Sequence, residues 1–409
     1  MLKKISTRDL KTGMFLHELC GSWMDHPFWK TRFLLRDEQD IVRVQKAGIT
    51  ECWIDVSKGA DVDQRVPSKS TPEVEAEIQE ELSGADQIPS LEVKAVPMAE
   101  ELTRARKICE QGQEKVRELF GEARLGKAIC AEECLPIVDE IASSVYRNPG
   151  AIISLARLKD KDEYTYMHSV AVCALMVALG RQLGLDDQAC REAGLAGMLH
   201  DMGKAFIPLS ILNKPGRLTD DEFTIVKSHP EKGWQALKDG PGIGAVTLDV
   251  CLHHHEKMDG TGYPHGLKGE EISLVARMGA VCDVYDAITS NRPYKNGWDP
   301  AMSIQKMAEW AKGGHFDEHV FQAFVKSLGI YPVGSVVRMA SGRLGVVVEQ
   351  HPASLLTPRV KVFYSTKSQM RIVPETVDLA HPLCQDRIVA KDTAERYGIQ
   401  HVEQLWATV

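Results

Sequence analysis

Between residues 98 and 328, apolar residues recur at the spacing of one helix face, and Gly or Pro residues mark the joints between successive segments. Amphipathic helices that follow one another so closely must bury their apolar faces against each other, so the pattern predicts an all-helical domain. We expect this domain to span 98–330, with its core at about 140–330. The predicted helices cover residues 100–125, 135–146, 164–183, 187–199, 220–238, 246–254, 273–289, 300–312 and 317–327.

The segments on either side predict two smaller domains. Residues 1–60 combine short apolar runs with one helical pattern, which indicates a small α+β module. Residues 331–409 alternate apolar and polar side chains, which indicates a small β-rich module. The predicted architecture is therefore multidomain, with an all-α domain flanked by these two modules. The expected details are strands at 13–17, 51–56, 334–339, 345–349 and 359–364, helices at 39–47 and near 390–398, and an aromatic core cluster at 22–29.

Residues 61–97 have the composition of a disordered linker. Prolines punctuate the stretch, and from 61 to 100 ten acidic side chains stand against three basic ones. This segment therefore carries most of the net charge of −8, and the acidity says little about what the folded domains bind. A negative balance of this kind argues against a broad basic surface for a nucleic-acid polymer.

The chain shows no targeting or membrane signal. Its apolar stretches fall short of the ~20 residues that span a bilayer, and no secretory apolar core follows Met1. We therefore expect a cytoplasmic protein. The ten cysteines are scattered without zinc-ribbon spacing; Cys130 and Cys134 could share a metal, but we interpret the thiols as structural residues in a reducing compartment.

Histidines and aspartates fall inside or at the ends of several predicted apolar helices. Burying them is costly unless they share a partner, and divalent iron or manganese suits a mixed set of imidazoles and carboxylates. The adjacent pair His200-Asp201 is informative because one aspartate can bridge two ions ~3.5–4 Å apart, the separation of two-metal hydrolysis sites. Lys204, one helical turn after His200, is placed to contact phosphate oxygens. The pattern comprises His168, His200, Asp201, His229, His253, His254, His255, Glu256, Asp283 and Asp286.

The segment His200-Asp-Met-Gly-Lys204 resembles the signature of the HD phosphohydrolase superfamily. His254-His-Glu-Lys-Met-Asp-Gly-Thr-Gly-Tyr-Pro-His-Gly-Leu267 resembles the extended motif of its HD-GYP subfamily, and the blocks 283–287 and 292–295 match the motif that follows. The similarity runs from about residue 160 to 330. Residues 1–60 resemble, more weakly, a small domain often fused to such proteins.

The resemblance implies a phosphodiesterase that hydrolyses the bacterial second messenger cyclic di-GMP to linear pGpG, with GMP as a further product, by attack of a metal-bridging hydroxide. Such an activity lowers messenger levels and so affects biofilm formation and motility. Asp201 is implied as the bridging carboxylate and Lys204 as the catalytic lysine at the scissile phosphate. Two divalent ions are implied, with His168, His200, Asp201, His229, His254, His255 and Asp283 as ligands, Lys204, Tyr263, Arg292 and Lys295 in the substrate site, and Asp286 orienting a ligand.

Two departures from the family pattern affect this expectation. Members with three metals carry a Glu four residues before the first ligand histidine, where this chain has Tyr164 with Glu163 beside it. Neighbours on a helix point ~100° apart, so we expect two ions and leave the second cleavage to GMP open. His253 turns the usual double histidine into a triple one. Capping or core packing explains His315 and His319 better than ligation does.

Three alternatives differ in class. The chain could be a cyclic di-GMP sensor without activity, but the intact His-Asp pair and lysine favour an enzyme. It could act on another cyclic dinucleotide, cyclic GMP-AMP for example, or on a nucleoside phosphate. A response-regulator output is excluded because residues 1–60 are too short for a receiver domain. The flanking modules suggest a protein partner such as a diguanylate cyclase with a GGDEF domain, and helix 100–125 is a candidate dimer contact.

Overall fold

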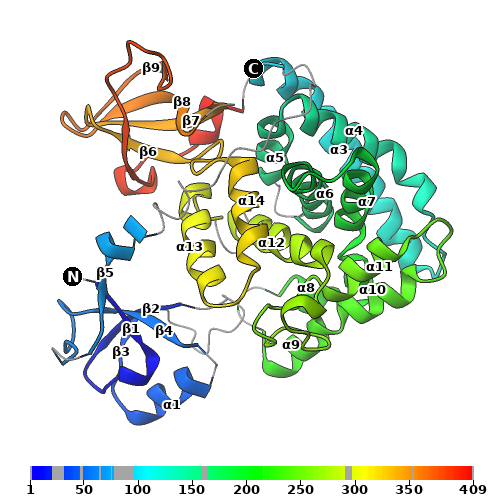
Figure 1. The fold of residues 1–409 in the computed structure, drawn as a ribbon, viewed down its shortest axis with the longest axis horizontal. Coiled ribbons are helices and arrows are strands. Elements are labelled where there is room, and N and C mark those ends of the chain that lie inside the picture. Colours follow the sequence, from blue (N-terminus) through cyan, green and yellow to red (C-terminus); the bar gives the residue numbers. More distant parts are fainter. Residues whose placement is uncertain are drawn as a thin grey trace. The chain divides into compact units, whose positions relative to one another are not determined.

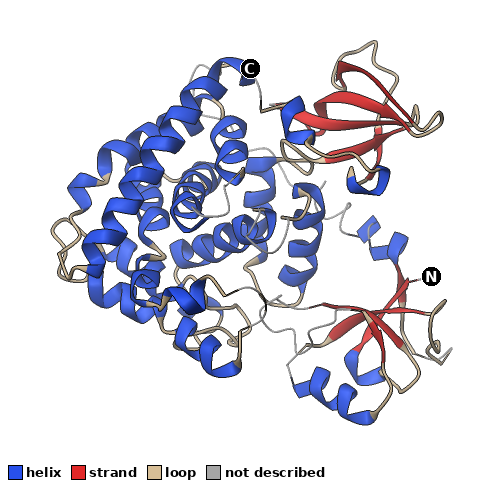
Figure 2. Ribbon diagram, turned by 180° about the vertical axis from the view of Figure 1, so that it is seen from behind, coloured by secondary structure: helices blue, strands red, loops and turns tan. Residues whose placement is uncertain are grey.

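The computed structural model describes residues 2–20, 32–46, 49–63, 66–74, 76–77, 96–158, 164–214, 216, 218–290, 297–351 and 354–407. The chain forms two compact units, one of residues 1–84 with 305–315 and one of residues 85–304 with 316–409 (Figure 1). Helices make up most of the second unit, and each unit contains one five-stranded sheet (Figure 2).

The N-terminal unit is built on an antiparallel sheet with strand order β3-β2-β4-β1-β5. Its buried face carries Leu16, Ile54 and other apolar residues that alternate along the strands, and α1 adds Val44 to the same core. The α+β character expected of this region is therefore present. The elements are β1 (Leu2–Ser6), β2 (Phe15–Cys20), β3 (Phe33–Leu34), α1 (Glu38–Lys46), β4 (Glu51–Asp55) and β5 (Lys69–Ser70).

Part of the predicted linker 61–97 is folded, which corrects that expectation. Strand β5 pairs with β1, Val74 is buried, and Lys3 forms an ion pair with Asp61 at 2.7 Å. The acidic composition misled the prediction, because the acidic side chains that the structure describes in this segment, Asp61, Asp63, Glu73 and Glu77, are exposed beside the buried Val74. The expected aromatic cluster at 22–29 lies outside the described residues, as do 78–95.

One helix contributes to both units. The C-terminal half of α13 (Pro300–Lys312) belongs to the N-terminal unit, where the ammonium of Lys306 lies 3.3 Å from Glu18 and 2.9 Å from Glu309. Lys306 and Glu309 are both buried, so this ion pair is part of the interior of that unit. The sequence had placed the whole helix in the helical domain.

The helical part of the second unit surrounds α6, in which every side chain from His168 to Gly180 is buried. Because a helix that is apolar on all sides must be covered on all sides, α3, α4, α5, α7, α12 and α14 pack around it. These helices are α3 (Met98–Arg124), α4 (Leu135–Arg147), α5 (Pro149–Arg157), α6 (Tyr164–Gln182), α7 (Asp187–Leu199), α8 (Leu209–Leu212), α9 (Asp220–Lys227), α10 (His229–Leu237), α11 (Ala245–His253), α12 (Leu274–Thr289) and α14 (Glu318–Leu328).

The predicted helix 220–238 is two helices, α9 and α10, that meet at Ser228. Pro230 has no N–H to give to the carbonyl of Val226 four residues earlier, so the helix cannot continue through it. That carbonyl instead accepts a hydrogen bond from Nδ1 of His229 at 2.8 Å. The break therefore also fixes the direction of the His229 ring. Helices α5 and α8 were not predicted.

The C-terminal module is an antiparallel sheet of order β10-β6-β7-β8-β9. Val337, Val347 and Val360 form its apolar core. The helix predicted near 390–398 is wrong for the most part, because residues 388–391 pair with β6 and only a 3-10 turn at Glu395–Tyr397 follows. The strands are β6 (Val336–Met339), β7 (Arg343–His351), β8 (Ser354–Ser365), β9 (Met370–Asp378) and β10 (Ile388–Lys391).

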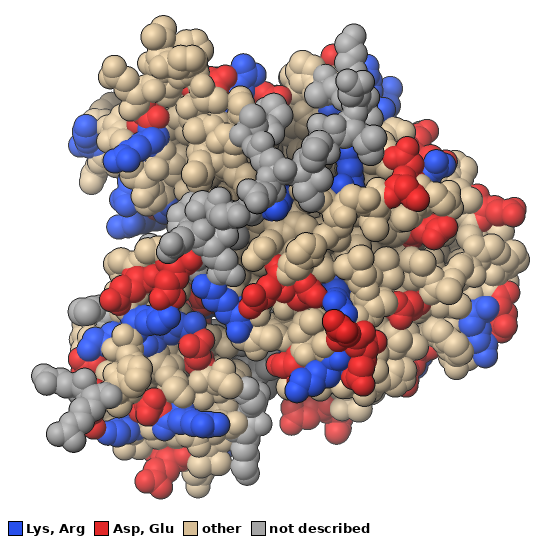
Figure 3. Space-filling model, viewed as in Figure 1, with Lys and Arg blue, Asp and Glu red and all other residues tan. Residues whose placement is uncertain are grey.

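Two general properties of the described residues bear on function. None of their helices combines the length and the apolar character that a bilayer span needs. On the face seen in Figure 3, basic and acidic side chains are interspersed, so neither sign of charge covers the described part of that face. The described cysteines are free thiols.

Candidate metal centre

The first group of site residues lies where α6, the end of α7 and α12 meet. His168 comes from the buried part of α6, and Asp283 and Asp286 come from neighbouring turns of α12. Nε2 of His168 lies 3.0 Å from Oδ1 of Asp283, and its Nδ1 lies 2.6 Å from Oδ2 of Asp286. Asp286 therefore holds one side of the ring, and the other side faces the centre, as a ligand-orienting carboxylate does.

His200 and Asp201 occupy the tight turn that ends α7. Nδ1 of His200 donates to the carbonyl of Gly197 at 2.7 Å, so its Nε2 is free to face the centre. The turn packs directly on α10: a Cβ on Gly203 would lie 1.8 Å from the carbonyl oxygen of His229. Only glycine permits this approach, which brings Asp201 next to His229.

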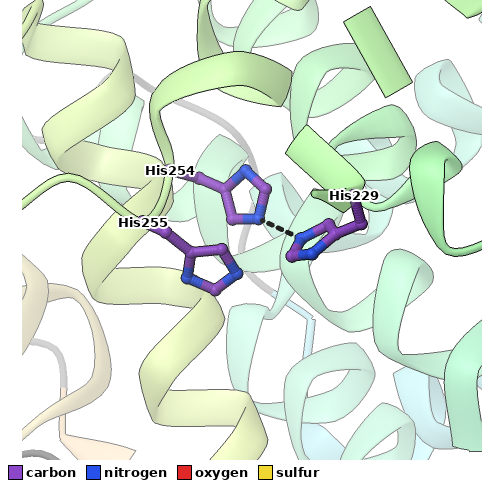
Figure 4. A group of neighbouring side chains, drawn as sticks. All are labelled: His229, His254 and His255. Carbon is purple, nitrogen blue, oxygen red and sulfur yellow. Dashed lines mark hydrogen bonds between the residues drawn. The ribbon is translucent and has the colours of Figure 1, made fainter. Parts of the chain in front are cut away.

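A second group consists of His229, His254 and His255, whose rings converge in Figure 4. His229 is the first residue of α10, and the other two directly follow α11. Nδ1 of His254 donates to the carbonyls of Val250 and Cys251, both at 3.0 Å, and its Nε2 lies 3.3 Å from Nε2 of His229. Backbone carbonyls thus orient two of these rings toward the same point.

The carboxylate of Asp201 lies between the two groups. Its Oδ2 is 3.4 Å from Nε2 of His168 and 3.4 Å from Nε2 of His200. Its Oδ1 is 3.2 Å from Nε2 of His229 and 3.8 Å from Nε2 of His254. One oxygen faces each group, and this is the arrangement that a carboxylate bridging two ions requires.

The residues present fit a pair of metal ions. Nitrogen and oxygen donors lie within 4.8 Å of one another in three overlapping sets: His168, His200 and Asp283; His200, Asp201 and His254; His229, His254 and His255. Nε2 of His200 and Oδ1 of Asp201 are buried and have no hydrogen-bond partner among the described residues. Such orphaned buried atoms are costly unless something else satisfies them, and a bound metal ion would do so here.

The electrostatics of the carboxylates suit this role. Burial would raise the pKa of Asp201, but the Lys204 ammonium and the imidazole of His200 outweigh it and hold the pKa well below its ordinary range. Burial likewise opposes ionisation of Asp283, and the neighbouring imidazoles of His168 and His200 again leave its pKa well below the ordinary range. Both carboxylates are therefore anionic at neutral pH, as a carboxylate that holds a cation must be.

The imidazoles divide into two kinds. Burial, followed by the neighbouring imidazoles, lowers the pKa of His254 to about 3 and that of His255 well below its ordinary value. These rings stay neutral and keep a lone pair for a metal ion. Burial opposes protonation of His200, but the carboxylates of Asp201 and Asp283 outweigh it and raise the pKa of that ring.

The other predicted site residues lie as follows. Lys204 is in a 3-10 turn (Met202–Phe206), not on a continued helix, and its ammonium contacts Oδ2 of Asp201. Tyr263 stacks on the ring of His255 with 4.7 Å between centroids, and its bond to Pro264 is cis. Arg292, Lys295 and the side chains of residues 163 and 164 lie outside the described residues.

Two residues that the sequence analysis did not assign a role shape the loop around Tyr263. Glu256 is buried, and its carboxylate accepts three backbone N–H groups, from His265 at 2.7 Å, Gly266 at 3.1 Å and Leu267 at 3.1 Å. Lys227 places its ammonium 5.2 Å from the centre of the Tyr263 ring. In the sequence, Glu256 could have been identified from its position directly after the paired histidines. No sequence pattern indicated a role for Lys227.

The chain matches known families and known proteins. Residues 2–134 match a domain of unknown function (DUF3391), and residues 152–320 match the HD domain family. The former match extends well past the predicted module 1–60. Across 99% of its length the chain is 52% identical to a cyclic di-GMP phosphodiesterase of Pseudomonas aeruginosa, 96% of which it covers.

Shorter matches cover part of the chain. The chain is 43% identical to a cyclic di-GMP phosphodiesterase response regulator of Xanthomonas campestris, over 36% of this chain and 40% of that one. It is 34% identical to a 3'3'-cGAMP-specific phosphodiesterase of Vibrio cholerae, over 41% of this chain and 38% of that one. With the near-complete match to the Pseudomonas protein, these findings show that the chain belongs to the HD-GYP family of HD-domain phosphodiesterases.

Proposed function

We propose that the protein hydrolyses cyclic di-GMP to linear pGpG. The observation that carries this proposal is the position of Asp201, whose two oxygens face two separate groups of donors. The 52% identity to a cyclic di-GMP phosphodiesterase along nearly the whole of both chains supports the substrate.

Two divalent ions fit the two donor groups. His168, His200 and Asp283 would hold one ion, His229, His254 and His255 the other, and Asp201 both. The bound pair supplies Lewis-acid activation of water and neutralises charge on the phosphoryl group. Nitrogen-rich sites with carboxylates suit iron or manganese, and the absence of a glutamate at position 164 supports two ions and pGpG as the final product.

The remaining residues bind substrate and handle charge. Lys204, at Oδ2 of Asp201, lies where its ammonium stabilises negative charge on a phosphate oxygen and assists the leaving group. Tyr263 forms an aromatic surface beside His255 on which a guanine base stacks. Arg292 and Lys295 contact the phosphates and the guanine.

A second substrate is favoured by one specific observation, the 34% identity to a 3'3'-cGAMP-specific phosphodiesterase. Both molecules have two phosphates in a ring and at least one guanine, so the metal centre treats them alike. Selectivity between them depends on contacts to the second base.

The test is turnover by the full-length protein, purified without oxygen because ferrous sites oxidise. Bound metal is measured by elemental analysis, and cyclic di-GMP and 3'3'-cGAMP are supplied separately. We expect about two ions per chain, pGpG as the product, and higher kcat/KM for cyclic di-GMP. Asp201→Asn should lose metal and activity, whereas Asp139→Asn, at an exposed carboxylate on α4, should retain both. A metal-loaded protein without turnover contradicts the proposal, and a preference for 3'3'-cGAMP changes the substrate.

A further inference from the structure

A pair of imidazoles lies outside the centre described above. Nε2 of His253, the last residue of α11, is 3.1 Å from Nδ1 of His265 in the loop that follows the Gly-Tyr-Pro segment. The two ring centroids are 5.3 Å apart. His253 precedes His254 in the chain, and successive residues of a helical turn point ~100° apart, so this pair and the centre occupy different sides of the α11 end.

Asp249 fixes the orientation of the first ring. Its Oδ1 lies 2.7 Å from Nδ1 of His253, and its Oδ2 is held by the hydroxyl of Ser273. A carboxylate without a proton can only accept, so Nδ1 of His253 carries the hydrogen and Nε2 presents its lone pair to His265. A carboxylate behind a histidine in this way is the usual outer partner of a metal-ligating imidazole.

The separation of the two nitrogens matches two ligands of one ion. Metal–nitrogen bonds of about 2.0–2.1 Å that meet at 90–109° place the nitrogens ~2.8–3.4 Å apart. The observed 3.1 Å lies within that interval. His265 is exposed, so water can complete the coordination sphere, and its ring can present a lone pair at Nδ1 while Nε2 keeps its hydrogen in solvent.

We propose that His253 and His265 form a second, peripheral binding site for a divalent transition-metal ion of the kind that imidazole favours, such as Zn²⁺, Ni²⁺ or Cu²⁺. The ion would link the end of α11 to the loop two residues after Tyr263. This proposal does not depend on the identity of the substrate. The two histidines are distinct from the residues proposed to hold the two ions of the candidate metal centre.

The side chains can be changed without disturbing the loop. Glu256 holds the backbone N–H of His265, not its ring, so His265→Asn leaves that contact in place. His319, exposed on α14, provides a matched control because His319→Asn removes an imidazole elsewhere. Asp201→Asn provides a protein whose catalytic centre is impaired while the pair at His253 is intact.

The experiment is calorimetric titration of the full-length protein with Zn²⁺, together with elemental analysis before and after. We expect wild type and His319→Asn to bind one ion per chain more than His253→Asn or His265→Asn, with unchanged metal in the catalytic centre. Asp201→Asn should retain the additional ion, and Asp249→Asn should weaken its binding ~10–100-fold.

Cu²⁺ electron paramagnetic resonance gives a readout that a purely structural histidine pair would not produce. The Cu²⁺ spectrum of Asp201→Asn, after subtraction of the spectrum of the same protein with His265→Asn added, should contain nitrogen couplings from the two imidazoles. Equal Zn²⁺ stoichiometry in wild type and His265→Asn, or a copper spectrum that the added substitution does not change, would overturn the proposal and leave the pair as a hydrogen bond between α11 and the loop.

Discussion

Nδ1 of His168 and Oδ2 of Asp286 are separated by 2.6 Å, and both side chains are buried. Because Asp286 holds the hydrogen on Nδ1, Nε2 remains available to an ion. We expect Asp286→Asn to weaken metal binding ~10–100-fold while the protein stays folded. Competition with a chelator, followed by elemental analysis, measures the change. Retention of wild-type affinity would remove Asp286 from this role.

Lys204 is expected to act on turnover rather than on metal content. Its ammonium contacts the bridging carboxylate, but the carboxylate has other donors around it. We expect Lys204→Met to lower kcat ~10²–10³-fold, the cost of losing one charge-stabilising donor, with both ions retained. Lys232→Met, which removes a lysine on α10 whose ammonium donates to the carbonyl of Phe206 instead of to Asp201, is the control. Loss of metal in Lys204→Met would show that the lysine has a structural role instead.

Glu256 is expected to set the affinity for substrate through the Tyr263 loop. Glutamine in its place accepts at one position only and directs an NH₂ group toward the backbone N–H of the loop. We expect Glu256→Gln to raise KM about fivefold or more with metal content unchanged, and to cost ~1–3 kcal/mol of stability. Glu271→Gln, at an exposed carboxylate that accepts one N–H in the same loop, should change neither. A fall in kcat alone would contradict the assignment.

Lys227 is expected to contribute to the same binding surface. Its ammonium lies over the ring of Tyr263 and, at 4.7 Å, over the ring of Phe223. It therefore places positive charge beside Tyr263, on which we propose that a guanine base stacks. An interaction of this kind contributes ~0.5–1 kcal/mol, which predicts a rise in KM of two- to fivefold for Lys227→Met. Lys238→Met is the control, because it removes a similar contact, over the ring of Trp234, that does not involve Tyr263. An equal rise in KM for Lys227→Met and Lys238→Met would exclude a specific role of Lys227 in substrate binding.

The ion pair between Glu101 and Arg147 is expected to govern acid stability. Burial opposes ionisation of Glu101, but hydrogen bonds from Arg147 at 2.7 Å and Ser144 at 2.8 Å leave its pKa below the ordinary value. Folding therefore releases a proton at low pH, and this stabilisation is present above about pH 4.5 and is lost as pH falls through the lowered pKa.

Removing one member of this pair tests the argument. Arg147→Met leaves the buried carboxylate of Glu101 with the longer contact to Arg104, at 3.5 Å, and should cost ~3 kcal/mol at pH 7. Urea unfolding at pH 7 and pH 4 provides the measurement. Stability should fall less between these values in Glu101→Gln than in wild type, and the reverse order would contradict the assignment.

The donors of the metal centre could be found from the sequence because each lies at a helix end or on a buried helix face, where a polar residue stands out. The division of these donors into two groups, one at each oxygen of Asp201, could not. It depends on which oxygen of Asp201 faces His168 and which faces His229, and that follows from the close approach at Gly203. No local pattern encodes a contact between residues so far apart in the chain.

The errors have equally specific causes. Helical periodicity continues through Ser228, so it concealed the break that Pro230 imposes. Acidic composition concealed the packing of Val74 in a segment that was expected to be disordered. The strand at Ile388–Lys391 exists because β6 offers it a partner, and an edge pairing of this kind cannot be deduced from four residues.

The membership of Gln305–His315 in the N-terminal unit has a consequence for biosynthesis. Domains generally fold as the ribosome releases them. The N-terminal unit, however, lacks Lys306 and Glu309 until α13, which contains both residues, has been translated. When the first 84 residues leave the ribosome, the N-terminal unit therefore still lacks residues 305–315. Glu18 cannot form its ion pair with Lys306 until α13 has been synthesised. A proteolytic fragment that ends at residue 84 would lack α13 and therefore the same ion pair.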